Sequence, residues 1–94
     1  MANAHKAVNA ETKRVRISTW TFEDGDATGF HTHEFDYVVV PTTGGTFEVV
    51  DRDGGTRELN QEAGIAYLGV EGTSHDVVNR SGRTTSFVEI ELKP

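Results

Sequence analysis

Residues 25–44 read GDATGFHTHEFDYVVVPTTG, and this stretch decides the fold. Residues 37–40 are β-branched or aromatic, which favours a pleated strand. Pro41 ends the run, because proline cannot donate to a ladder of strand hydrogen bonds. His31 and His33 lie before the run and are separated by one residue. The stretch therefore predicts a strand over residues 30–40 that carries two histidines near its start.

The sequence on either side of this stretch repeats one pattern, a short strand followed by a turn. Residues 15–22 have β-branched side chains at every second position, and their β-branched and aromatic content suits a pleated strand. Asp53-Gly54 is typical of a tight hairpin between two strands. We also expect strands at residues 46–50, 56–59, 65–70, 75–80 and 84–92, and one helical turn at residues 60–63. So many short strands in 94 residues predict an all-β sandwich or small barrel.

Composition excludes several classes of function. The net charge of −6 makes a nucleic-acid backbone a poor partner, and no basic amphipathic segment favours a membrane surface. Without cysteine there is no disulfide, no thiolate ligand and no cysteine nucleophile. The polar, alanine-rich residues 1–11 lack the apolar core of a secretory signal, so we expect a cytoplasmic protein.

The histidines are the candidate site. On a strand, His31 and His33 project from one face with their backbones about 6.5–7 Å apart, so both rings can reach one ion. A third ligand from a neighbouring strand would leave coordination positions open, and His75 is the remaining candidate. Two exposed histidines on an edge strand, without a metal, would produce the same sequence pattern. The fourth histidine, His5, is expected to be a solvated residue.

The glycines around these histidines resemble the two motifs of the cupin superfamily. The first motif matches in spacing at Gly25, His31, His33, Tyr37 and Gly44, with tyrosine where cupins carry glutamate. The second motif matches at Gly64, Val70, Gly72, His75 and Asn79, with valine in place of proline. The resemblance covers residues 15–92 and is closest to small single-domain cupins.

The resemblance implies a cupin double-stranded β-helix, a jelly-roll barrel, over residues 13–94, preceded by a partly flexible segment at residues 1–12. It implies that His31, His33 and His75 hold a divalent transition metal, with Fe, Mn, Ni or Zn as candidates. It also leads us to expect a homodimer, since a small open barrel leaves sheet edges that a second copy can cover.

Tyr37 stands where the cupin carboxylate ligand is expected, so three versions of the site are open. In the first version, water completes a three-histidine site. In the second, Tyr37 or a water that it orients takes the fourth position and acts in catalysis. In the third, a bulge in the strand turns Asp36 inward. Alternation from His33 places Phe35 and Tyr37 inward and Asp36 outward. The three-histidine site therefore ranks first and the Asp36 site last.

Alternation also predicts a small, largely apolar cavity above the histidines, suited to a small organic ligand. We expect Glu89 and Glu91 to face solvent, and Asn79 to bond to backbone at a turn. Two functions remain open. One is a metalloenzyme of the cupin oxygenase type that transforms a small metabolite. The other is a non-catalytic module that binds a small molecule as an accessory of a catabolic pathway.

Overall fold

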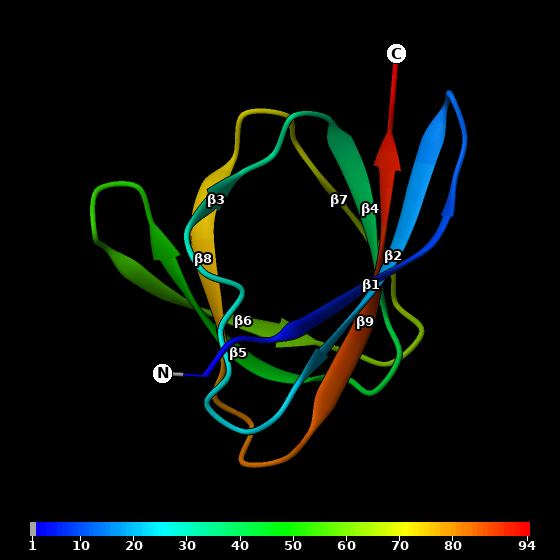
Figure 1. The fold of residues 1–94 in the computed structure, drawn as a ribbon. Coiled ribbons are helices and arrows are strands. Elements are labelled where there is room, and N and C mark those ends of the chain that lie inside the picture. Colours follow the sequence, from blue (N-terminus) through cyan, green and yellow to red (C-terminus); the bar gives the residue numbers. More distant parts are fainter. Residues whose placement is uncertain (1) are drawn as a thin grey trace.

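The computed structural model describes residues 2–94 and consists of β-strands joined by turns (Figure 1). The strands are β1 (His5–Glu11), β2 (Val15–Phe22), β3 (His31–Thr32), β4 (Asp36–Pro41), β5 (Gly45–Asp51), β6 (Thr56–Gln61), β7 (Tyr67–Gly69), β8 (Ser74–Asn79) and β9 (Thr85–Leu92). No helix within the described residues is long and apolar enough to cross a membrane.

Two antiparallel sheets form the barrel wall. One sheet has the strand order β1-β2-β9-β4-β7, and the other has the order β3-β8-β5-β6. Viewed along the barrel, the two sheets lie on opposite sides of the interior (Figure 1). The predicted all-β jelly-roll architecture is confirmed.

The predicted strand over residues 30–40 is wrong in one respect, because the chain breaks it into β3 and β4. β3 pairs with β8 in one sheet, whereas β4 pairs with β7 and β9 in the other. The chain bends at residues 33–35 and changes sheets there. A backbone bond from His33 N–H to the Thr73 carbonyl, 2.9 Å long, holds the bend against the segment before β8.

The other predicted strands are present with small shifts of their ends, but the helical turn at residues 60–63 is not. Asn60 and Gln61 instead complete β6, which pairs with β5. The hairpin between β5 and β6 closes as predicted, with Gly54 at a φ of +87° that other residues rarely adopt. At Asn60 and Gln61, strand pairing with β5 has outweighed the local helical preference.

The N-terminal segment contains a strand that the sequence did not indicate. Residues His5–Glu11 form β1, which pairs with β2 through a register shift between Val8 and Ala10. Nearly all of its side chains are exposed, so backbone pairing holds it to the barrel. His5, expected to be a solvated residue in a mobile tail, is an exposed residue of this edge strand.

The apolar core fills one end of the barrel. The rings of Phe22, Phe47 and Phe87 pack with centroids 5.2–5.8 Å apart and are at most 5% exposed. Burying each ring contributes about 1.5–3 kcal/mol to folding. Along the inner face of β9 the buried side chains change from Thr85 and Phe87 to Glu89 and Glu91. The opposite end of the interior is therefore polar.

Candidate metal centre

Three histidines converge at this polar end. His31 on β3 lies directly opposite His75 on β8, and His33 follows β3 at the bend. The Nε2 atom of His33 is 3.1 Å from His31 Nε2 and 3.2 Å from His75 Nε2. The ligand atoms of all three rings lie within 4.8 Å of one another. The three predicted ligands therefore meet at one point, as a shared ion would require.

The Nδ1 atoms of His31 and His75, on the ring side away from the shared point, differ in their hydrogen bonding. His31 Nδ1–H donates to the Gly29 carbonyl at 2.8 Å, which fixes that ring. In a neutral imidazole this leaves a lone pair on His31 Nε2, directed at the other rings. His75 Nδ1 is buried and has no hydrogen-bond partner among the described residues. The hydrogen bond at Nδ1 thus orients the ring of His31, whereas no such bond within the described residues orients the ring of His75.

Burial keeps two of the three rings neutral. It lowers the pKa of His33 to about 4, and the nearby His31 and His75 add to the effect. Burial likewise lowers the pKa of His75 to about 4, with further contributions from His31 and Arg57. Neutral imidazole is the form that binds metal, so these two rings are ready as ligands at neutral pH.

Tyr37 lies beneath the cluster with its ring against His33. The two ring centroids are 3.8 Å apart, the planes differ by 13°, and Tyr37 is 5% exposed. Burial raises the pKa of Tyr37 to about 12, and the negative charge of Glu89 adds to the rise. Tyr37 is therefore a neutral phenol in the absence of metal, packed where cupins carry a carboxylate.

Asp36 does not replace that carboxylate. Its side chain is exposed and accepts a 2.8 Å hydrogen bond from the Glu71 backbone N–H. The version of the site that turned Asp36 inward is thus excluded, because β4 keeps the alternation that places Tyr37 inside. Phe35, also expected inward, is half-buried.

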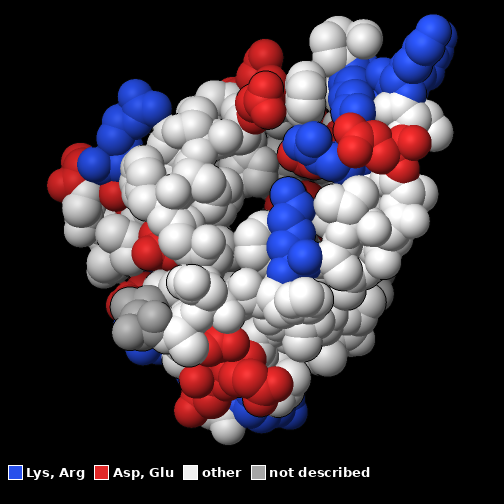
Figure 2. Space-filling view, in the orientation of Figure 1, with Lys and Arg blue, Asp and Glu red and all other residues white. Residues whose placement is uncertain are grey.

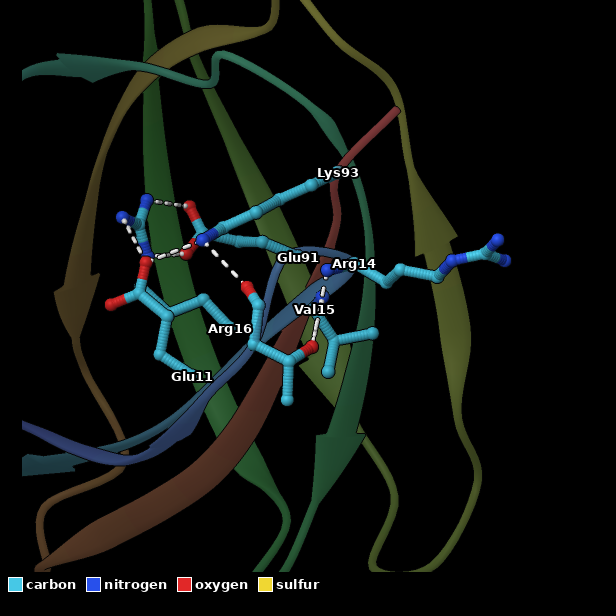
Figure 3. A network of polar contacts seen from close by, with 7 residues as sticks. Glu11, Arg14, Val15, Arg16, Glu91 and Lys93 are labelled. Carbon is cyan, nitrogen blue, oxygen red and sulfur yellow. Dashed lines mark hydrogen bonds and ion pairs between the residues drawn. The ribbon is translucent and has the colours of Figure 1, made fainter.

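The expectation that Glu89 and Glu91 face solvent is wrong, because each is only 6% exposed. Arg16 on β2 explains Glu91, since its Nε and Nη2 both donate to that carboxylate (Figure 3). This pairing lowers the pKa of Glu91. Glu11 and Lys93 extend the network at the surface (Figure 3).

No residue that the structure describes pairs with Glu89 in this way. Burial raises its pKa to about 6, and the neighbouring charge of Glu91 adds to the rise. It lies directly opposite Val39 in the β4–β9 pairing, on the inner face of the barrel. Glu89 is thus a buried carboxyl group that titrates close to neutral pH.

A cavity of about 320 Å³, here called the main cavity, extends from the histidines between the sheets. His31, His75, Tyr37 and Glu89 line its polar part, and Val39, Val49, Val77 and Phe87 line its apolar part. Arg57, Gln61 and Tyr67 line it from β6 and β7. The volume suits a small organic ligand.

A second cavity of about 250 Å³ reaches the same cluster from a more charged side. It shares Trp20, Thr28, His31 and Glu89 with the main cavity and adds Lys6, Arg16, Glu34 and Glu91. Figure 2 shows a hollow on this face of the molecule with basic and acidic side chains beside it. The histidine cluster can therefore be approached from two sides.

Asn79 has the predicted structural role. It is fully buried, its Nδ2 donates to the carbonyls of Glu23 and Arg83, and its Oδ1 accepts from the Ser81 backbone N–H. It ties together two turns at the end of the barrel away from the histidines.

Sequence reasoning missed Arg57 as a residue of the site. A signal was available, because the Asp53-Gly54 hairpin sets the β5–β6 register and places Arg57 opposite the buried Val49. The inward position of Glu89 had no comparable signal, because carboxylates on strands usually face solvent.

No family model matches the chain, but individual proteins do. It is 40% identical over 86 residues to the β-alanine degradation protein BauB of Pseudomonas aeruginosa, covering 92% of this chain and 90% of that protein. A cupin domain from Bordetella pertussis has a similar structure, with a TM-score of 0.95 and 36% identity over 99% of this chain and 96% of that one.

A cupin superfamily protein from Desulfitobacterium hafniense shares the fold at a TM-score of 0.75 and 15% identity, over 98% of this chain and 79% of that chain. Together with the barrel topology and the histidine positions, these similarities show that the chain belongs to the cupins, as a small cupin of the kind that includes BauB.

Proposed function

We propose that the protein holds one divalent transition metal on His31, His33 and His75, and that this centre binds or transforms a small organic metabolite. The convergence of the three imidazoles, with Nε2 atoms 3.1 and 3.2 Å apart, carries the proposal. Burial keeps His33 and His75 neutral, and the fixed ring of His31 directs a lone pair at the same point. An all-nitrogen donor set suits Fe, Mn, Ni or Zn.

The main cavity supports a role for the metabolite at this centre. Three protein ligands leave coordination positions open, and His31 and His75 line the cavity directly. A bound metal would supply Lewis-acid or, for Fe or Mn, redox chemistry of the oxygenase type. Tyr37 stacks on His33, and we propose that its neutral hydroxyl acts as a proton donor in the site.

A non-catalytic binding role is the alternative, favoured because Tyr37 stands at the position where cupins carry the carboxylate ligand. The Pseudomonas aeruginosa relative is named for β-alanine degradation, so we propose a catabolic setting for this chain in either case. An enzyme would consume its substrate and lose activity in His75→Ala. A binder would show only ligand-dependent stabilisation of the fold.

We also propose that the protein is a homodimer. Val38, Val88, Ile90 and Ile17 lie on adjacent strands of the five-stranded sheet and alternate with buried inward residues, so they point away from the barrel. Their row continues to Leu68 on β7, which is 73% exposed. An apolar row across four strands is the kind of surface that a second copy covers.

Metal content by mass spectrometry, on protein purified without a histidine tag, tests the metal centre. We expect about one transition metal per chain in the wild type and none in His75→Ala. His5→Ala is the matched control, since His5 is exposed on β1, and it should keep the metal. A wild-type protein that contains no metal and takes up no added Fe, Mn, Ni or Zn would contradict the proposal.

A further inference from the structure

One cationic side chain, Arg57, lines the main cavity from a position that strand pairing dictates. Arg57 on β6 lies directly opposite Val49 on β5, and Val49 is fully buried. Residues directly opposite in an antiparallel pair project from the same face of the sheet. Arg57 therefore starts from the inner face, in a row with Leu59 and Gln61, which also line the cavity.

The guanidinium of Arg57 is available to a ligand. Among the described residues it makes no hydrogen bond, and its ion pair is a loose one, with Nε 3.7 Å from Oδ1 of the largely exposed Asp51 side chain, which a ligand carboxylate can displace. The side chain is 53% exposed, so it lies towards the cavity mouth. Arg16, by contrast, is occupied by two hydrogen bonds to Glu91.

The charge of Arg57 also acts across the cavity, on the facing sheet. Burial raises the pKa of Tyr67 on β7, and the charge of Arg57 opposes this rise. The guanidinium therefore makes the cavity more favourable for an anion.

A second donor lies on the same side of the cavity. The Tyr67 hydroxyl accepts a 2.8 Å hydrogen bond from Gln61 Nε2, which leaves its own proton free to donate. Burial raises the pKa of Tyr67, so the hydroxyl stays protonated at neutral pH. Between these groups and the histidines, the wall is formed by Val39, Val49 and Val77.

We propose that the metabolite bound in this cavity is a small organic carboxylate, held by Arg57 at the mouth while its apolar body extends towards the histidines. An arginine fork matches a carboxylate with two parallel hydrogen bonds. A single guanidinium balances one negative charge, and Glu89 on the facing wall disfavours a more highly charged anion such as phosphate. The inference rests on the proposed function for the site and adds the class of its ligand.

Calorimetric titration with butyrate and its neutral isostere butyramide tests the assignment, on protein with and without bound zinc. We expect butyrate to bind the wild type more tightly than butyramide, and Arg57→Gln to weaken butyrate binding about tenfold with little effect on butyramide. Arg57→Lys should lie between the two, because it keeps the charge but not the fork. Arg80→Gln is the matched control, since Arg80 is an exposed arginine paired with Glu48.

Three results would overturn the inference. Arg57→Gln could bind butyrate as tightly as the wild type, which would show that Arg57 does not hold the carboxylate. Butyramide could bind as well as butyrate, or inorganic phosphate could bind through Arg57 more tightly than butyrate. Loss of zinc binding alone would contradict the metal centre and not the role of Arg57, because the titration without zinc still compares the variants.

Discussion

At the scale of single residues, the partner of a buried group decides its pKa more than residue type or burial alone does. Glu89 and Glu91 lie on the same face of one strand and are equally buried, yet their pKa values move in opposite directions. Arg16 stabilises the charged form of Glu91, whereas Glu89 has no such partner within residues 2–94. Glu89 is therefore the carboxyl group whose ionisation the fold disfavours.

This difference predicts how Glu89 affects stability. Its pKa is raised to about 6 in the folded state from an ordinary value of 4.5, so the folded protein holds this proton more tightly. Stability is lost as pH rises from about 4.5 through 6, and the loss at pH 7 is about 2 kcal/mol. In metal-free protein, Glu89→Gln should be more stable than the wild type at pH 7 and equal to it near pH 4.5.

Urea unfolding of both proteins between pH 4.5 and pH 8 measures the difference. Glu62→Gln is the control, because Glu62 is exposed, and it should follow the wild type at every pH. A Glu89→Gln protein that is less stable than the wild type at pH 7 would contradict the prediction. Zinc should reduce the pH dependence, since a nearby cation favours the charged carboxylate.

At the scale of elements, the pairing of β4 with β7 positions Tyr37. Gly69 lies directly opposite Tyr37, and its φ is not in the positive range that requires glycine. A Cβ added at Gly69 would lie 2.0 Å from Tyr37 Cζ. Glycine is therefore needed there because the tyrosine ring lies over the backbone of β7, where it also stacks on His33.

Gly69→Ala should accordingly displace Tyr37 and cost about 1–3 kcal/mol of unfolding free energy. Tyr37→Ala removes the obstacle, so adding Gly69→Ala to it should cost much less, with a coupling of about 1 kcal/mol or more. A double-mutant cycle by urea unfolding measures this coupling. Gly55→Ala, which meets only Asp53 in an exposed hairpin, should cost less than about 1 kcal/mol. Additive costs would show that the ring does not require Gly69.

Features that depend on local sequence could be predicted, whereas features that depend on which strands pair could not. The spacing of Gly25, His31 and His33 predicted the histidine cluster, because turn glycines and strand periodicity are local properties. The break between β3 and β4 was missed, because it depends on which sheet each half joins. The burial of Glu91 was missed for a similar reason, since its partner Arg16 lies 75 residues away in sequence.

At the scale of the whole molecule, the two faces of the five-stranded sheet explain why a second copy is expected. The inner face packs on the core and the site, whereas the outer face carries the apolar row through Ile17, Ile90, Val38 and Leu68. The strands β1 and β7 are the free edges of this sheet. In a chain of 94 residues, an uncovered row of this kind leaves a substantial part of the apolar side chains in contact with water.

Light scattering coupled to size-exclusion chromatography should therefore give twice the chain mass of 10.3 kDa. Ile90→Lys places a charge in the centre of the row and should yield a folded monomer, because burying an unpaired charge between two copies is unfavourable. Thr21→Lys is the matched control, since Thr21 is also on the outer face but lies opposite the polar Ser86, and it should stay dimeric. A wild-type monomer would exclude the dimer, and a dimeric Ile90→Lys would place the contact at a sheet edge, where strand pairing and not apolar burial would hold the copies together.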